Sequence, residues 1–281
     1  KVRRLKTMES EISSKDLLKE ILNVENLLIV QDIDGVCIPL VKDPLERAIE
    51  ITYIEAARKL NGEFYVLTNG EHGGPRGVNR VIEKAYQQAG RSLENDLYLP
   101  GLAAGGIEYQ NKFGAIKYPG VSKEELEFLN LLPKEMEKLL SKSLNSIFPQ
   151  RNQKEIDILA RSAVLATKFS PTINLNGIFS LIPNEIELQK KVQIILEEIM
   201  GKLINLAMDR GLTHSFYLHI APNLGKKGEK EIIKYSSNGD VGTTDIQFML
   251  TGAIKEAGLL VLINKFIKTR IGKSPLGDEF N

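Results

Sequence analysis

The chain has 281 residues, of which 42% are hydrophobic and 26% are charged, and its formal net charge is +1. This length and composition predict a globular protein with a substantial core, in one large domain or two smaller ones. The small net charge excludes a strong overall electrostatic attraction to nucleic acid or acidic membranes. With no apolar run near the roughly 20 residues that span a bilayer, no visible signal peptide and one cysteine, Cys37, we expect a cytoplasmic protein without membrane or nucleic-acid partners. The oligomeric state stays open, with a monomer as one option.

The first half of the chain alternates between predicted helices and strands. A helix over residues 13–22, capped by Ser13 or Ser14, precedes an apolar strand at 27–30. Helices at 46–60 and 76–89 then alternate with strands at 64–67 and 97–99. Strands that are apolar throughout are typical of a sheet covered by helices on both faces. The pattern predicts a doubly wound α/β fold with a mainly parallel, Rossmann-like sheet.

The pattern changes after residue 108. We expect a hairpin at 109–118, helices near 122–145, 153–162 and 184–210, strands at 215–220 and 231–235, and a polar loop at 223–230 between those two strands. Strands and helices segregated in this way predict an α+β insert. A short strand at 248–250 and an apolar helix that includes Lys255 complete the series.

Asp32 and Asp34 directly follow the first apolar strand. Alternation is expected to turn both side chains to the same side, with Ile33 anchored in the core and Gly35 allowing a sharp turn. Two carboxylates this close repel each other unless a cation intervenes, and magnesium prefers such oxygen ligands. An ordinary turn or helix-capping pair of aspartates would give the same local pattern. Thr68 ends the second strand in a similar way, and ligands bind beyond such strand ends.

Asp32-Ile33-Asp34-Gly35-Val36 matches the first motif, Asp-x-Asp-x-[Thr/Val], of the haloacid dehalogenase-like phosphatase superfamily. The chain resembles this family, whose first Asp attacks phosphorus and whose second Asp transfers protons. The resemblance implies that Asp32 is the nucleophile and Asp34 the general acid and base. It also implies that Mg²⁺ binds a carboxylate oxygen of Asp32 and the backbone carbonyl of Asp34.

Two further motifs of the family fit. Thr68 corresponds to the Ser or Thr that ends the second strand, and its hydroxyl, with the neighbouring Asn69, would hold a phosphoryl oxygen. Lys255 resembles the lysine that opens a helix after a short strand, neutralises the phosphoryl group and holds Asp32. Taken alone, a turn threonine or a solvated helical lysine would be unremarkable at these positions. The long interval between Thr68 and Lys255 classifies the architecture as a core at 1–108 and 248–281 with an inserted α+β cap at 109–247.

The family's fourth motif is acidic and completes the magnesium site. It should follow Lys255, but no suitable strand does, and the resemblance implies that the motif lies beyond the sequence given. Asp240 and Asp245 have the motif's Gly-Asp-x-x-x-x-Asp spacing and are a substitute, although they precede Lys255.

Several longer segments resemble glucosylglycerol-phosphate phosphatases; they are residues 25–32, 64–72, 97–106, 221–225 and 242–250. This resemblance implies magnesium-dependent hydrolysis of glucosylglycerol 3-phosphate to a compatible solute used under salt stress. It suggests that Glu71 accepts hydrogen bonds from sugar hydroxyls and that His72 donates to phosphate or substrate. Further candidates in the insert and near its end are Asn223, Lys226 and Asp245. We interpret His214 and His219 as structural, because the three histidines are scattered.

Three alternatives remain at this point. The same chemistry on sucrose, trehalose or mannosylglycerate phosphate would leave the same motifs. A catalytically incomplete protein that binds sugar phosphates or regulates a partner would fit the absent fourth motif. A flavodoxin-like or response-regulator fold fits less well, because those domains have no large insert of this type.

Overall fold

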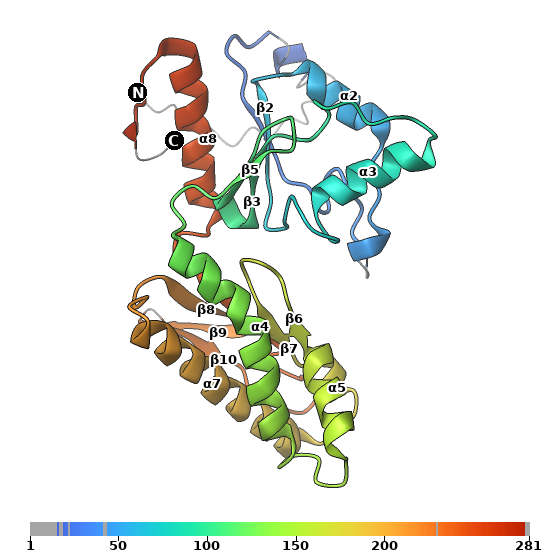
Figure 1. Ribbon diagram of the computed structural model, residues 1–281, viewed down its shortest axis with the longest axis vertical. Coiled ribbons are helices and arrows are strands. Elements are labelled where there is room, and N and C mark those ends of the chain that lie inside the picture. The colour runs from blue at the N-terminus through green and yellow to red at the C-terminus, as the bar shows by residue number, and fades with distance from the viewer. Residues whose placement is uncertain (1–15, 17–18, 22, 42–43, 229, 279–281) are drawn as a thin grey trace.

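The computed structural model describes residues 16, 19–21, 23–41, 44–228 and 230–278, which form two bodies stacked along the long axis (Figure 1). The upper body contains a five-stranded sheet, and the lower body contains a four-stranded sheet. The chain is therefore a mixed α/β protein. Of the expected first helix, residues 19–21 are helical, whereas its proposed caps, Ser13 and Ser14, lie outside the described residues.

Three parallel strands begin the upper sheet, and a hairpin extends it. The parallel strands are β1 (Ile29–Gln31), β2 (Phe64–Leu67) and β3 (Gly101–Ala103). The hairpin of β4 (Glu108–Gln110) and β5 (Ile116–Lys117) joins β3 in the antiparallel sense. The sheet is thus mixed, and not mainly parallel as expected, across the described strands.

Helices cover the upper sheet on two faces. Phe64 and Val66 pack in the cluster that includes α2 (Ile51–Lys59) and α3 (Val78–Gln88). The intervening Tyr65 and Leu67 instead pack with α8 (Lys255–Ile271), which lies across the sheet in Figure 1. Because neighbouring residues of a strand point to opposite faces, the apolar run at 64–67 is buried on both. This confirms the prediction made for that strand.

The third strand lies later than expected, in the glycine-rich segment itself. Leu97 and Leu99 are buried in the core cluster, but they belong to no strand. Gly101 begins β3 with φ of 140°, and a Cβ on it would lie 2.1 Å from the carbonyl oxygen of Val66. Only glycine allows the backbone to approach β2 this closely. The apolar pattern at 97–99 therefore correctly indicated buried residues but not a strand. The pairing of β3 with β2 depends on Gly101, which has no side chain.

Two edges of the expected insert also differ from prediction. The hairpin over 109–118 pairs with β3, whose free edge offers backbone hydrogen-bonding groups, and so it belongs to the upper sheet. The strand expected at 248–250 is longer, β11 (Asp245–Leu250), and it pairs with two strands of the lower sheet. The chain crosses to the lower body after β5 and returns after β11.

Helices lie against one face of the lower sheet. The long ones, α4 (Lys123–Leu144), α5 (Gln153–Ala163) and α7 (Ile186–Asp209), agree with the predicted ranges, and capping boxes at Ser122 and Asn152 explain where the first two begin. No helix within the described ranges is long and apolar enough to cross a membrane. The described elements not yet given are η1 (Pro44–Glu46), η2 (Ala104–Gly106), α6 (Asn176–Phe179), β6 (Val164–Leu165), β7 (Thr172–Asn174) and β8 (Phe216–Ala221). The strands of the lower sheet lie in the order β6-β7-β11-β8.

The loop expected at 223–230 is largely a strand. β9 (Asn223–Lys227) pairs with β10 (Lys230–Ile233) as an antiparallel hairpin. Most of its residues are exposed, so backbone pairing rather than apolar burial creates the strand, and the hydrophobic pattern did not reveal it.

Candidate active site

A tight loop presents both aspartates at the carboxyl end of β1. The side chain of Ile33 is fully buried, and its carbonyl accepts hydrogen bonds from the N–H groups of Cys37 and Ile38, both at 3.1 Å. Gly35 has φ of 79° and donates its N–H to the Ile38 carbonyl at 2.8 Å. The expected anchor and the expected sharp turn are both confirmed. The loop closes on itself and leaves the flanking carboxylates directed outward.

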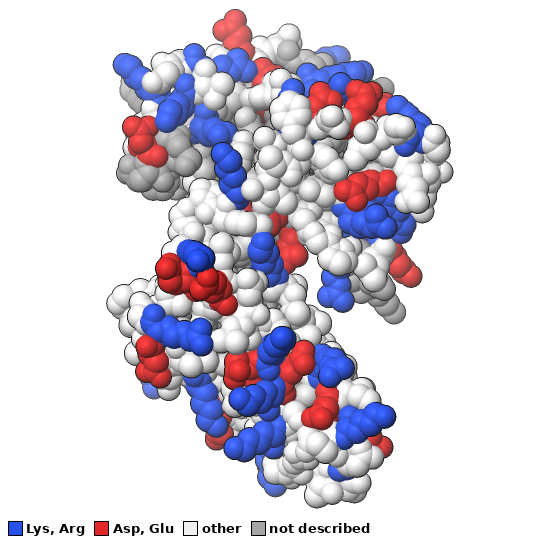
Figure 2. Space-filling view, in the orientation of Figure 1, with Lys and Arg blue, Asp and Glu red and all other residues white. Residues whose placement is uncertain are grey.

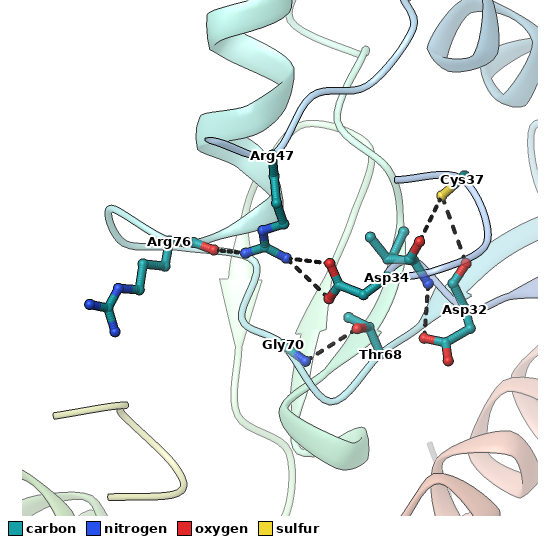
Figure 3. Close-up of polar contacts among 8 residues, drawn as sticks. Asp32, Asp34, Cys37, Arg47, Thr68, Gly70 and Arg76 are labelled. Atoms are coloured by element: carbon teal, nitrogen blue, oxygen red, sulfur yellow. Dashed lines mark hydrogen bonds and ion pairs between the residues drawn. The ribbon is translucent and has the colours of Figure 1, made fainter. Parts of the chain in front are cut away.

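Each carboxylate faces its own basic side chain. Asp32 Oδ2 lies 2.6 Å from Lys255 Nζ, and Asp34 accepts from Arg47 Nη1 at 2.9 and 3.1 Å. Figure 3 shows the two carboxylates turned apart, with Asp34 directed at Arg47 and Asp32 directed away from it. This differs from the expected arrangement, in which both point to the same side around one cation. Separate pairing reduces the repulsion between the two like charges.

Glycines bring Lys255 to Asp32 across the length of the sequence. Gly105, with φ of 68°, lies so close to the residues before α8 that a Cβ on it would be 2.7 Å from the carbonyl oxygen of Ala253. A Cβ on Gly106 would be 3.1 Å from the Cα of Gly258. The segment of η2 therefore packs directly on the backbone at the start of α8. Lys255 is the first residue of that helix, as predicted.

Thr68 and Asp34 converge on Gly70. Thr68 is buried at the end of β2, and its Oγ1 accepts a hydrogen bond from the Gly70 N–H at 3.2 Å, which leaves the hydroxyl proton available to donate. A Cβ on Gly70 would lie 3.6 Å from Thr68 Oγ1 and 3.7 Å from Asp34 Oδ2. It would also lie 3.9 Å from Arg47 Nη1. Asn69, between them, is exposed and lines the cleft described below.

Arg47 is the site residue that the sequence analysis missed. It is only 7% exposed, its Nη1 contacts Asp34, and its Nη2 donates to the carbonyl of Arg76 (Figure 3). The sequence predicts a helix over 46–60 that would include Arg47, whereas α2 begins only at Ile51 and Arg47 lies in the segment before it. Its spacing from Asp34 follows no motif. The available signal was an arginine two residues before Ile49, which is buried.

A cleft between the two bodies exposes this site. Two adjoining cavities, of about 790 and 630 Å³, share Asn69, Gly70 and Phe169 among their lining residues. Asp34 and Arg47 line the larger cavity, and Lys255 lines the smaller. Figure 2 shows a hollowed waist between the bodies, with acidic and basic side chains both present there. The volumes are those of small-molecule sites.

The two predicted substrate contacts have different surroundings. Glu71 lines the larger cavity, and its Oε1 accepts from the Lys168 N–H at 2.6 Å, which connects the two bodies. His72 is fully buried, with Nε2 3.2 Å from the Gly101 carbonyl, and burial lowers its pKa to about 4. It lines neither cavity, so the predicted contact between His72 and a substrate does not fit this placement.

The acidic substitute for the fourth motif lies elsewhere. Asp240 forms an ion pair with Lys234, and Asp245 accepts from Asn174 and Thr244, each at 2.7 Å. Neither aspartate lines the two cavities. Within the described residues, no three His, Cys, Asp or Glu side chains cluster as a metal site.

The loop after β1 can supply oxygen ligands to a metal. The half-exposed carboxylate of Asp32 is a hard donor, and the backbone carbonyl of Asp34 lies two residues further on the same loop. Magnesium is commonly held by one or two carboxylates together with water and phosphate oxygens. This partial donor set therefore fits magnesium.

Comparison with known proteins identifies the family. Residues 26–281 match the family model described as glucosylglycerol-phosphate phosphatase. A glucosylglycerol-phosphate phosphatase of Synechocystis sp. is 42% identical over 262 residues, which is 92% of this chain but 61% of that enzyme. The chain thus spans less than two thirds of that relative's length. The C-terminal domain of the Candida albicans trehalose synthase regulatory protein aligns over 94% of this chain and 73% of its own, with a TM-score of 0.42 and 8% identity. That structural likeness is too low to support an argument, whereas the family model covers almost the whole chain. The chain belongs to the glucosylglycerol-phosphate phosphatase family.

Proposed function

We propose that this protein hydrolyses glucosylglycerol 3-phosphate to glucosylglycerol and phosphate, through an aspartyl phosphate on Asp32. The observation that carries the proposal is the ion pair between Asp32 and Lys255, next to a cleft that Lys255 and Asp34 line. The buried Thr68 lies beside Asp34 near Gly70. The 42% identical relative is a glucosylglycerol-phosphate phosphatase, which supports glucosylglycerol phosphate as the substrate class. The upper body would be a haloacid dehalogenase-like core, and the lower body, at about 119–250, its inserted cap.

The chemistry needs a nucleophile and a proton carrier. A carboxylate oxygen of Asp32 attacks phosphorus, and the bond from phosphorus to the glycerol oxygen breaks. Protonated Asp34 gives its proton to that oxygen, so glucosylglycerol leaves as a neutral alcohol. Asp34 then takes a proton from water, whose oxygen attacks the aspartyl phosphate and releases phosphate and Asp32.

Basic and hydroxyl groups would hold the phosphoryl oxygens during these steps. Lys255 Nζ lies against Asp32, where charge accumulates in the transition state, and the Thr68 hydroxyl retains a proton to donate. Arg47 holds the Asp34 carboxylate in one orientation through Nη1. Because Arg47 is buried and also bound to the Arg76 carbonyl, it acts as a fixed support for the proton carrier.

Magnesium is the metal that these residues would hold, through the Asp32 carboxylate and the Asp34 carbonyl. When bound, it supplies positive charge that reduces the repulsion between the phosphate and the attacking carboxylate. Chelation of divalent ions is expected to abolish phosphate release, and magnesium to restore it.

The test is phosphate release from glucosylglycerol 3-phosphate beside the phosphates of sucrose, trehalose and mannosylglycerate. Glucosylglycerol 3-phosphate should be hydrolysed with the highest kcat/KM. Uncatalysed phosphate-monoester hydrolysis is slow enough that enzymes accelerate it by up to about 10²¹-fold, so Asp32→Asn should leave almost no activity. Asp209→Asn, the same change at the exposed end of α7, is the matched control. An Asp32→Asn variant that kept most of the rate would refute the mechanism. Tight binding of substrate without turnover would instead favour a sugar-phosphate-binding role.

A further inference from the structure

A hydrogen bond joins the two bodies away from the two chain segments that connect them. Glu71 lies in the upper body, three residues after Thr68, and its Oε1 accepts from the Lys168 N–H at 2.6 Å. Lys168 belongs to the lower body, in the loop between β6 and β7. Domains that are linked by short segments move relative to each other unless contacts hold them. This hydrogen bond therefore constrains how the two bodies sit across the cleft.

The loop that carries Lys168 is held against the first connecting segment. The Lys168 ammonium bonds to the Tyr118 hydroxyl, and its Nζ lies 4.1 Å from the centre of the Tyr118 ring. The buried ring of Phe169 packs on Tyr118, with the two ring centres 5.2 Å apart. A cation over an aromatic face and a pair of packed rings are both attractive contacts. The loop therefore presents the Lys168 N–H to Glu71 from a fixed position.

Backbone hydrogen bonds hold the segment around Glu71 from two sides. The Glu71 carbonyl accepts from the N–H of Val78, the first residue of α3, at 2.9 Å. On the other side, the Gly70 carbonyl accepts from the N–H of Ala104, in η2, at 2.6 Å. The main chain of Glu71 is thereby fixed between η2 and α3, and its side chain extends to the lower body.

A buried carboxylate of β4 supports the same segment. Glu108 is 2% exposed, and its Oε1 accepts from the His72 N–H at 2.5 Å. The Gly73 N–H also donates to this carboxylate. Burial raises the pKa of Glu108 above its usual value, and the two N–H groups lower it in part. The charge of Glu71 raises this pKa further, and the Lys168 ammonium lowers it. Hydrogen bonds from backbone N–H groups to a carboxylate are strong, so Glu108 fixes the turn that follows Glu71.

We propose that Glu71 and Glu108 form a clasp that holds the lower body in place over the active site. Glu108 fixes the turn after Glu71, and Glu71 holds the lower body through the Lys168 N–H. Both glutamates are therefore positioning residues for the reaction, and this role rests on the proposed phosphatase function. It differs from the contact with sugar hydroxyls that the sequence analysis expected for Glu71.

The clasp lies beside the groups of the proposed reaction. Asn69 and Gly70, which precede Glu71, line both cavities. Phe169, which follows Lys168, also lines both. The clasp thus ties together the two walls of the cleft, one from each body. Holding a cleft closed excludes water and keeps the reacting groups in place. The clasp should therefore raise kcat whether or not the substrate carries a sugar.

Hydrogen exchange at the Lys168 amide tests the clasp. Glu71→Ala removes the acceptor, so this amide should exchange about tenfold faster than in the wild type. Glu71→Gln keeps a side-chain carbonyl oxygen and should change the exchange rate by less than about threefold.

Two further variants complete the exchange experiment. Glu108→Gln replaces one acceptor oxygen by an NH₂ group, so it should release the turn and speed exchange at Lys168 by about threefold or more. Glu94→Ala breaks a surface ion pair with Arg58 within the upper body, and as the matched control it should leave the Lys168 amide unchanged. Unchanged exchange at Lys168 in Glu71→Ala protein, or in folded Glu108→Gln protein, would overturn the inference.

Kinetics on two substrates separate a clasp from a sugar contact. Glu71→Ala should lower kcat about tenfold on glucosylglycerol 3-phosphate and also on p-nitrophenyl phosphate, which has no sugar, and Glu71→Gln should keep most of the rate on both. A loss confined to the glycosylated substrate, mainly in KM, would assign Glu71 to the sugar and overturn the inference. The exchange measurement needs no substrate. If the wild-type protein failed to hydrolyse glucosylglycerol 3-phosphate, the proposed function would fail, and the exchange rate of Lys168 would still confirm or refute the clasp.

Discussion

Arg47→Met removes a buried guanidinium and leaves a side chain of similar length in its place. The substitution breaks the contacts of Nη1 with Asp34 at 2.9 and 3.1 Å and the hydrogen bond from Nη2 to the Arg76 carbonyl. It keeps every residue that would touch the substrate phosphate in the proposed mechanism. The variant therefore tests whether the contact between Arg47 and Asp34 contributes to stability and to proton transfer by Asp34.

The structure sets the expected magnitude. Removing one partner of a fully buried ion pair costs about 3–5 kcal/mol, and one hydrogen bond to a charged group contributes about 1.5–3 kcal/mol. The Asp34 side chain is 36% exposed, so water can replace part of the lost contact. We expect the free energy of unfolding to fall by about 2 kcal/mol. At about 2–4 °C per kcal/mol, Tm should fall by about 4–8 °C.

Activity should fall as well, because a mobile Asp34 is a poorer proton carrier. General acid–base catalysis contributes about 10²–10⁴-fold, and misplacing rather than removing the group should cost about 10–100-fold in kcat. Calorimetry measures Tm, and phosphate release measures kcat. Arg58→Met is the matched control, since Arg58 pairs with Glu94 and Asp96 at the surface, and it should lower Tm less and leave kcat unchanged. If Arg47→Met lost no more stability and no more activity than Arg58→Met, the supporting role of Arg47 would be wrong.

Three other changes test the surroundings of the site. Gly101→Ala would place a Cβ 2.1 Å from the Val66 carbonyl oxygen, so it should separate β3 from β2 and lower both Tm and activity, whereas Gly62→Ala, with nothing within 4 Å, should lower Tm less. Lys255→Met should lower kcat by about 10²–10³-fold. It should change Tm little, because the Lys255 and Asp32 side chains of this ion pair are 33% and 42% exposed. A fall in Tm as large as that of Arg47→Met would contradict this reasoning. Since burial lowers the pKa of His72 to about 4, its native form binds fewer protons than the unfolded chain, and stability is lost as the pH falls from 6.5 to 4. Urea unfolding at pH 7 and pH 4 measures this effect. Between these pH values the free energy of unfolding should fall by up to about 3 kcal/mol more for the wild type than for His72→Asn. Equal falls for the two proteins would show that His72 is not buried in its neutral form.

The local sequence pattern predicted the structure correctly where a strand or loop depends only on residues close to it in the chain. The run at 64–67 predicted a strand covered on both faces, and Phe64 and Leu67 do pack on opposite sides of the sheet. The same holds for the anchor at Ile33 and the turn at Gly35, because both depend on neighbours within a few residues. Pattern failed at 97–99 and at 223–227, where backbone pairing was decided by the neighbouring strand.

The sequence by itself determined the alternating α/β pattern, the position of Asp32 and Asp34 at a strand end, and the start of a helix at Lys255. It also determined the family, because the match to the family model runs from residue 26 to residue 281. Tertiary structure alone decided that Arg47 supports Asp34, that His72 is buried away from the cleft, and that Glu71 contacts Lys168 across it. Each of these depends on which side chains meet from segments far apart in the chain. Such contacts are created by the packing of sheets and glycine-rich loops, and the spacing of residues in the sequence does not predict them.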